Sequence, residues 1–136
     1  MENRRHYLYE IKPFSDGNGN LAVIEECAQI PFKIKRIFYE YGLNKTSLRG
    51  KHANRDSKFC FIAVSGSCAV IVDDGHSKTT YRLNKPNEVL FLNKMLWKTM
   101  TDFSKDCVLL VLSDCLYNPD EYIRNYLDYC LEVKND

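Results

Sequence analysis

The sequence predicts an all-β protein, a sandwich or a barrel, with one short helix at its C-terminal end. Short apolar segments recur at the roughly 8–12 residue spacing that is typical of such folds. Turn signals separate them, and helical spacing of apolar residues occurs only after Asn118. A chain of 136 residues has the size of one domain, which we expect over residues 1–136.

Eight segments are predicted as strands, because they are short and rich in apolar, β-branched or aromatic residues. They are 21–24, 34–41, 59–64, 68–72, 79–83, 89–92, 96–100 and 108–112. The triplet Ser65-Gly66-Ser67 predicts a tight hairpin between two of them. Asp73-Asp74-Gly75-His76 predicts a second turn, because Asp-Gly tolerates positive φ. We expect loops 15–20 and 43–48 at the rim of a binding site.

The last segment carries the signals of a helix. Asn118 can cap it, Pro119 suits its first turn, and the acidic residues that follow match the positive end of the helix dipole. Apolar residues then recur at helical spacing, at Ile123, Tyr126, Leu127 and Cys130. We expect this helix to pack against the outside of the barrel.

Charge and composition exclude several classes of protein. Nineteen basic and eighteen acidic residues give a net charge of +1, so nothing indicates a nucleic-acid partner. No apolar run approaches the length of a membrane-spanning helix, and the charged segment 1–10 lacks the core of a signal peptide. The six cysteines form no CxxC pair. We therefore expect a cytoplasmic protein with reduced thiols.

One of the three histidines is a candidate for chemistry. His6 lies in a charged N-terminal segment and His76 in the Asp-Gly turn, where each is expected to be solvated. His52 lies in a polar segment that leads into a predicted strand. If that segment is extended, His52 and Asn54 point to one face, where they would line a barrel cavity. A hydrogen-bonded structural histidine is the alternative at this stage.

A series of motifs along nearly the whole chain resembles the dTDP-sugar 3,4-ketoisomerases, the WxcM-like C-terminal family of the RmlC-like cupins. The motifs follow in the order and close to the spacing of that family. They are Ile24-Glu25-Glu26, Ile30-Pro31-Phe32, Ile34-Lys35-Arg36, Arg49-Gly50-x-His52-Ala53, Ser65-Gly66-Ser67, Asp73-Asp74-Gly75, Trp97, Met100-x-Asp102-Phe103-Ser104, Val108-x-x-Val111-Leu112 and Tyr122-Ile123-Arg124-x-Tyr126.

The resemblance implies a fold, a reaction and a partner. The fold is a cupin jelly-roll β-barrel, usually a homodimer that exchanges N-terminal strands. The substrate is a dTDP-linked 4-keto-6-deoxyhexose and the product its 3-keto isomer, which an aminotransferase uses to make a 3-amino sugar for surface glycans such as lipopolysaccharide. Moving a proton between C3 and C4 needs no cofactor and no metal. Which C4 configuration the product has stays open.

The resemblance also suggests site residues. His52 matches the family's catalytic base, since a neutral imidazole suits proton transfer between adjacent carbons. Asn54 stands where the family usually has a second histidine; it can hydrogen-bond an enediol oxygen but cannot carry a proton near neutral pH. Tyr39 matches a family tyrosine and is a candidate second acid or base. Lys98, after Trp97, also departs from the usual histidine.

Other residues are expected to bind the nucleotide sugar. Arg49 matches a family arginine, and its forked guanidinium suits a phosphate. The further substrate-binding candidates are Arg36, Lys51, Trp97, Tyr41 and Asn18.

Three alternatives stay open. A metal-dependent cupin oxygenase needs about three nitrogen or oxygen ligands, and the segment offers only His52 followed by Asn54. A 4-keto-sugar epimerase pairs a histidine with a carboxylate and uses a separate tyrosine. A non-catalytic sugar-nucleotide-binding cupin would explain the missing second histidine.

Overall fold

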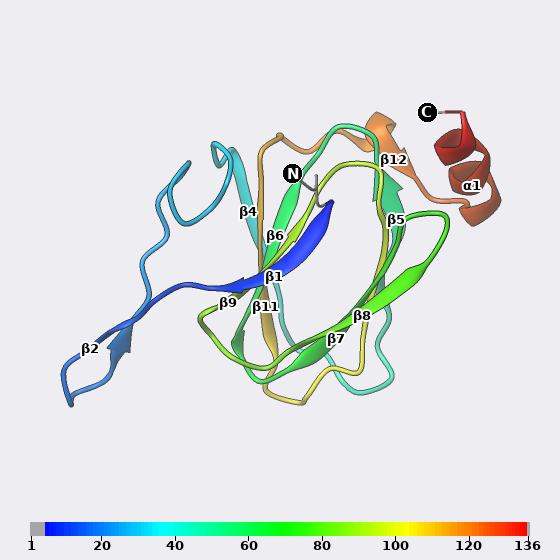
Figure 1. The fold of residues 1–136 in the computed structure, drawn as a ribbon. Helices are drawn as coiled ribbons and strands as arrows, with labels where there is room; N and C mark the ends of the chain where they lie inside the picture. Colours follow the sequence, from blue (N-terminus) through cyan, green and yellow to red (C-terminus); the bar gives the residue numbers. More distant parts are fainter. Residues whose placement is uncertain (1–4, 136) are drawn as a thin grey trace.

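The computed structural model describes residues 5–135 and shows two antiparallel five-stranded sheets facing each other as a barrel (Figure 1). The first sheet has the order β1 (His6–Glu10), β9 (Glu88–Leu92), β6 (Phe59–Ser65), β11 (Val108–Ser113) and β4 (Arg36–Glu40). The second has the order β12 (Tyr122–Ile123), β5 (Arg49–Asn54), β10 (Trp97–Thr101), β7 (Cys68–Asp73) and β8 (Lys78–Leu83). The expected domain 1–136 and the charged segment 1–10 both extend outside the described residues.

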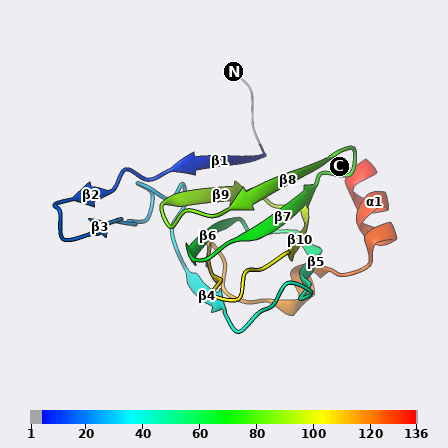
Figure 2. The same cartoon turned by 90° about the horizontal axis from the view of Figure 1, so that it is seen from below.

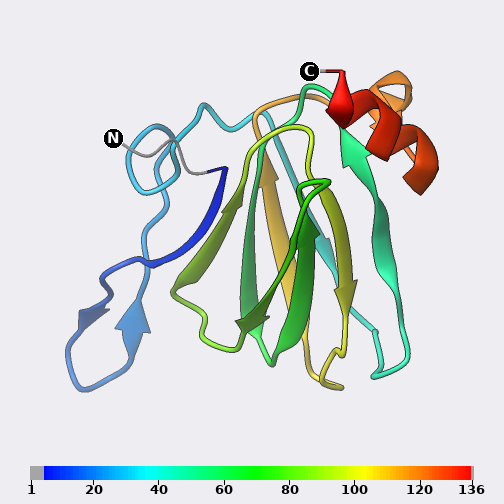
Figure 3. The ribbon, with the colours of Figure 1, turned by 45° about the vertical axis from the view of Figure 1, so that its right-hand side comes forward.

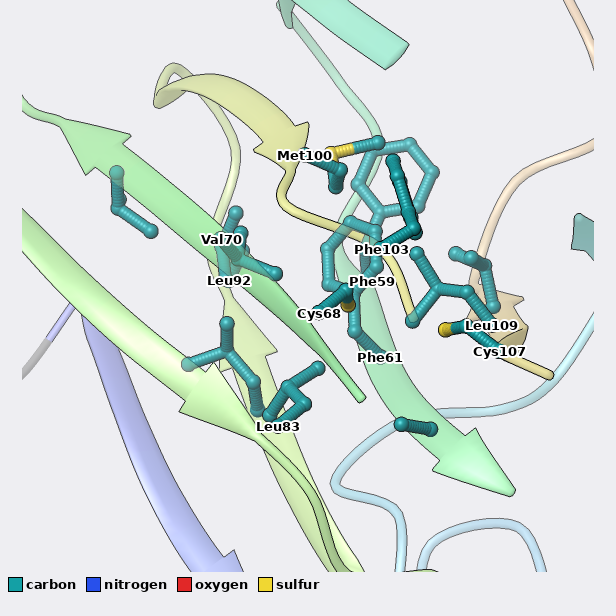
Figure 4. Packing of buried hydrophobic residues seen from close by; sticks show 14 of the residues in the cluster. Phe59, Phe61, Cys68, Val70, Leu83, Leu92, Met100, Phe103, Cys107 and Leu109 are labelled. Carbon is teal, nitrogen blue, oxygen red and sulfur yellow. The ribbon is translucent and has the colours of Figure 1, made fainter. Parts of the chain in front are cut away.

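The space between the sheets holds the main core (Figure 4). Alternate residues of each strand point into it, as the pleat requires. On β6, Phe59, Phe61 and Ala63 point inward, whereas Cys60 and Ile62 belong to a second cluster. Both faces of the first sheet are therefore apolar, which explains why β6 is a continuous hydrophobic run.

Each sheet is also covered on its outer side. Ile11, Ile30 and Phe32, from the segment that follows β1, pack on the outer face of the first sheet. Helix α1 (Tyr126–Lys134) lies outside the second sheet beside β5 (Figures 2 and 3). Tyr129 is its buried anchor, with its hydroxyl 3.0 Å from Asp73 O and 2.9 Å from Met95 O. The expected packing of a helix against the barrel is confirmed.

A short arm leaves the barrel between β1 and β4. It is the hairpin of β2 (Phe14–Ser15) and β3 (Asn20–Leu21), which projects to one side (Figure 3). The strand predicted over 21–24 is therefore wrong, because the pairing stops at Leu21. The two apolar residues of the arm, Phe14 and Leu21, are 68% and 60% exposed.

The turn Ser65-Gly66-Ser67 is not the expected hairpin. β6 belongs to the first sheet and β7 to the second, so this turn carries the chain across the barrel. A Gly-rich turn signals a reversal but does not say with which strand the next one pairs. The turn at 73–76 does close a hairpin, in which Asp73 pairs with Lys78.

The helix begins later than predicted. Asn118 caps only a short 3-10 helix, η1 (Pro119–Glu121), and its side chain accepts from Asp120 N. Ile123 then lies on β12, and Asn125 caps α1. β1 was not among the predicted strands. His6, its first residue, is not simply solvated, because its Nδ1 lies 2.7 Å from the Tyr81 hydroxyl.

All six cysteines are free thiols, and within residues 5–135 no helix has the length and apolarity needed to span a membrane.

Gly66 should be essential to the crossing between the sheets. Its φ is +66°, and a Cβ there would lie 2.8 Å from Cys107 Cα and closer still to the Ser104 and Asp106 side chains. Gly42 has nearly the same φ, +68°, with nothing within 4 Å. Gly42→Ala should lower the free energy of unfolding by about 1 kcal/mol, and Gly66→Ala by a further ~1–3 kcal/mol from the clash. Urea unfolding checks this, and equal losses would show that the contacts of Gly66 do not matter.

Candidate active site

A polar cavity of about 340 Å³ opens at one end of the barrel, between the two sheets. Strands β4, β5, β6 and β10 form its walls, together with the segment that includes η1 and β12. Its lining residues are Phe38, Glu40, Leu48, Arg49, Gly50, His52, Phe59, Phe61, Lys98, Met100, Tyr117, Tyr122 and Arg124. Charged side chains are part of this lining, whereas the core between the sheets is apolar. The cavity is therefore the candidate site.

A bulge in β5 decides which side chains enter the cavity. Lys98 pairs with His52, but the next residue of β10 pairs with Gly50, so Lys51 is left over. Gly50 and Lys51 both have positive φ, of 79° and 60°. Residues 49 and 52 would face opposite sides of a regular strand. The bulge turns both Arg49 and His52 inward and leaves Lys51 exposed, a use of bulges that is common beside functional sites.

His52 is held as a neutral imidazole. Its ring stands edge-on to Tyr122 at a centroid distance of 4.8 Å. Burial, joined by the positive charges of Lys98 and Arg124, lowers the pKa of His52 to about 3. This is well below the value near 7 that suits a general base at neutral pH. Nδ1 is buried and has no hydrogen-bond partner among the described residues.

A buried polar chain runs from Lys98, which lines the cavity, to Asn54 and Glu121, which do not. The expectation that Asn54 lines the cavity is wrong, because its side chain is fully buried within this chain. Lys98 Nζ donates to Asn54 Oδ1 at 2.9 Å, and Asn54 Nδ2 donates to Glu121 Oε2 at 3.1 Å. Glu121 also accepts from Ser57 N and Asp56 N, each at 2.9 Å, and from the Ser57 hydroxyl. Burial raises the pKa of Glu121, but these hydrogen bonds outweigh it and leave the pKa below its usual value. Glu121 is therefore an anion that helps to balance the buried Lys98.

Further cations lie at the cavity. Arg49 Nε donates to Glu40 Oε2 at 2.5 Å, and Arg124 stacks over Tyr122 at 4.6 Å from the ring centroid. Arg36 lies on the inner side of β4, over the rings of Phe38, Phe59 and Tyr117, which all line the cavity. Its Nε and Nη2 are buried without a hydrogen-bond partner among the described residues. A guanidinium in this position is available to an anionic ligand.

Several expected site residues lie elsewhere. Tyr39 and Tyr41 are 61% and 71% exposed and stack on each other outside β4, because Phe38 and Glu40 take the inward positions. Trp97 packs outside β10 against Tyr126 and Tyr129 of α1. The structure does not bring these three, or the exposed Lys51, into this chain's cavity. Asn18 lies in the turn between β2 and β3, on the projecting arm.

Among the polar and charged residues of the cavity, Glu40, Tyr117, Tyr122 and Arg124 were not predicted as site residues from the sequence. Alternation along β4 could have identified Glu40, since it follows Phe38 by two residues. The same alternation places Lys98, and not Trp97, inside the barrel. Tyr122 and Arg124 were assigned to a helix, so no sequence signal turned them toward His52.

A two-sheet barrel with a histidine-bearing cavity at one open end is the architecture of a cupin. The chain belongs to the FdtA family (WxcM-like, C-terminal), whose profile matches residues 4–134.

Relatives of known activity cover almost the whole chain. A TDP-4-oxo-6-deoxy-α-D-glucose-3,4-oxoisomerase from Aneurinibacillus thermoaerophilus is 37% identical over 126 residues, 93% of this chain and 88% of that protein. The solved TDP-fucose-3,4-ketoisomerase from Campylobacter jejuni is 41% identical with a TM-score of 0.91, covering 97% of this chain and 98% of the other. A mutant 3,4-ketoisomerase from Thermoanaerobacterium thermosaccharolyticum, solved with TDP-4-keto-6-deoxyglucose, is 32% identical with a TM-score of 0.94, covering 98% and 97%.

These matches confirm the family, the cupin barrel and the isomerase class that the sequence predicted. A 3'-monoepimerase from Streptomyces bikiniensis, at 16% identity and a TM-score of 0.77, shares the fold alone. Residues 5–135 contain no group of three or more His, Cys, Asp or Glu side chains that could hold a metal ion.

The lowered pKa of His52 predicts a specific acid sensitivity. The unfolded chain binds the histidine proton below about pH 6.5, whereas the folded protein binds it only near pH 3. The stability that this residue contributes is thus complete above pH 6.5 and is lost as the pH falls toward 3. In this window the free energy of unfolding should fall by up to about 1.4 kcal/mol per pH unit more in the wild type than in His52→Asn. Urea titrations of both proteins between pH 6.5 and 4 test this, and parallel curves would contradict it.

Proposed function

We propose that the protein converts a dTDP-linked 4-keto-6-deoxyhexose into its 3-keto isomer, as a step in making a 3-amino-3,6-dideoxyhexose. The observation that carries the proposal is the neutral His52 in a cation-lined cavity of a chain that belongs to this family. The relatives named above act on TDP-linked sugars of this kind. A 3-keto sugar is what an aminotransferase needs to place nitrogen on C3.

The proposed reaction is a pair of proton transfers. The C4 ketone acidifies the C3–H bond, so a base can remove that proton and leave an enediol. Returning a proton to C4 then places the carbonyl at C3. His52 is suited to both steps, because its imidazole is neutral and lines the cavity. A bound diphosphate would offset the cations that lower its pKa and so strengthen it as a base.

The nucleotide end of the substrate needs positive charge. Arg49 and Arg124 line the cavity, and Arg36 keeps two buried N–H groups without a protein partner. We assign the diphosphate to these guanidinium groups, with Arg49 releasing Glu40 in part when the ligand binds. The reaction moves only protons, so the proposal includes neither a metal nor a redox cofactor.

We also propose a homodimer in which the arm of β2 and β3 reaches the partner molecule. Phe14 and Leu21 would be costly to leave in water, since each exposes an apolar side chain on a hairpin that does not fold back on its own barrel. Asn18, near the tip of the arm, would then lie against the other subunit. This is the way in which Asn18 could contribute to a substrate site.

His52→Asn should reduce turnover by at least ~10²–10⁴-fold, the usual contribution of a general base. The amide preserves the approximate size of the ring but cannot accept the C3 proton. NMR detection of the 3-keto product, with calorimetric measurement of dTDP binding, separates loss of chemistry from loss of structure. His76→Asn, in the exposed turn, is the matched control and should keep full activity. If His52→Asn turned over normally, His52 would be structural.

The double variant Phe14→Ser/Leu21→Ser should be a monomer in sedimentation velocity at concentrations where the wild type is a dimer. The two serines remove the apolar side chains that the arm would bury against the partner molecule. Leu127→Ser/Leu131→Ser changes two equally exposed leucines on α1 and should stay dimeric. A wild-type monomer, or a dimeric arm variant, would refute the arm-mediated dimer.

A further inference from the structure

The Lys98 amine faces the same cavity as the His52 imidazole. Lys98 is 2% exposed, and in the register of the second sheet it lies directly opposite His52. Opposite residues on neighbouring antiparallel strands project from the same face, with Cβ atoms about 4.5–5.5 Å apart. Both side chains line the cavity. Two nitrogen groups that can exchange protons therefore stand side by side, on two different strands.

The surroundings of Lys98 leave part of its amine free for a ligand. An ammonium group has three donors. One is used by Asn54 Oδ1, and the ring of Phe59 lies beneath the nitrogen at 4.7 Å from its centroid. No further acceptor within residues 5–135 is hydrogen-bonded to Nζ, although the group is buried. A buried cation with a free donor that faces a cavity is suited to an oxygen of the bound sugar.

The isomerisation has two steps, formation of the enediol and its collapse to the 3-keto sugar. Each step needs one proton transfer at carbon and one at oxygen. One proton leaves C3 and another is delivered to C4. In addition, the C4 carbonyl oxygen gains a proton to become a hydroxyl, and the C3 hydroxyl loses one to become a carbonyl. One imidazole between the two carbons accounts for the carbon protons only. A second group must supply and then accept the proton on oxygen.

We propose that Lys98 is this second proton carrier, acting on the oxygens while His52 acts on the carbons. As His52 takes the C3 proton, the Lys98 ammonium gives a proton to the C4 oxygen, and the enediol forms. As the imidazolium returns its proton to C4, the neutral Lys98 amine takes the proton from the C3 hydroxyl. Both groups end as they began, and no other reactant is needed. This role rests on the proposed ketoisomerase function.

The electrostatic surroundings allow Lys98 to give up its proton. Burial lowers the pKa of Lys98 to about 7, while the charge of Glu121 acts in the opposite direction. Glu121 is linked to the amine through the neutral amide of Asn54, and within residues 5–135 the ammonium forms no direct ion pair. The charged or ionisable groups nearest the amine are His52 of β5, Glu121 of η1, Arg124 after β12 and Arg36 of β4, whose guanidinium lies over the same Phe59 ring as the amine. Glu40, Arg49, Tyr117 and Tyr122 also line the cavity.

The proposal is tested with three substitutions at Lys98 in the full chain. Lys98→Gln keeps a donor for Asn54 but cannot carry a proton, Lys98→Met fills the space without polarity, and Lys98→His can exchange a proton near neutral pH. We expect Gln and Met to lower kcat by ~10²–10⁴-fold with dTDP binding unchanged, and His to recover at least about tenfold over Gln. The high-pH limb of the wild-type kcat profile should be absent in Lys98→Gln.

Three results of the Lys98 substitutions would contradict the proposal. If Lys98→Gln and Lys98→His were equally slow, or if kcat fell only together with dTDP binding, Lys98 would be a structural cation and the proposal would be wrong. Wild-type activity in Lys98→Gln would have the same meaning. Failure of the proposed function appears differently: the wild-type protein would form no 3-keto product, whatever stands at position 98.

Discussion

The site is organised around one buried positive charge. Enclosing an ammonium group in a barrel is costly unless hydrogen bonds and opposite charge compensate for the lost hydration. Here the Asn54 amide, the Phe59 ring face and the Glu121 carboxylate provide that compensation. Glu121 is in turn held by the backbone and side chain of Ser57. Burial is the main reason that His52 stays neutral, and the charge of Lys98 adds to it, so these two cavity residues affect each other's protonation.

Much of the fold followed from periodicity. Seven of the eight predicted strands overlap strands of the barrel, because short alternating or fully apolar runs are a direct consequence of the pleat. What periodicity could not provide is the partner of each strand. The turn at Gly66 has the composition of a hairpin, yet β6 and β7 lie in different sheets. Pairing across the barrel is decided by the whole set of apolar faces, which no local segment contains.

The site was predictable only in part, for a similar reason. His52 and Arg49 could be identified because they lie in one short motif, and both line the cavity. The bulge that brings them to one side depends on the register between β5 and β10, which the sequence does not display. Tyr39 was predicted because it matches a family tyrosine, and Trp97 because it belongs to the family motifs. Strict alternation would have favoured Lys98 and Glu40 instead. Tyr122 and Arg124 are placed at the cavity by the short strand β12. A strand of two residues is too short to be predicted from the sequence pattern.

The order of the strands has a consequence for how the chain reaches this structure. β1 pairs with β9 and β5 with β10, so most pairings join segments that are far apart in the sequence. Closing such loops costs chain entropy before the contacts between the strands can stabilise the structure. Among the ten barrel strands only β7 and β8 are paired neighbours in the chain, joined by the Asp-Gly turn. We expect that hairpin to form early, and the remaining strands to assemble slowly around it, so that the apolar faces of β6 and β9 stay exposed to aggregation until the barrel closes.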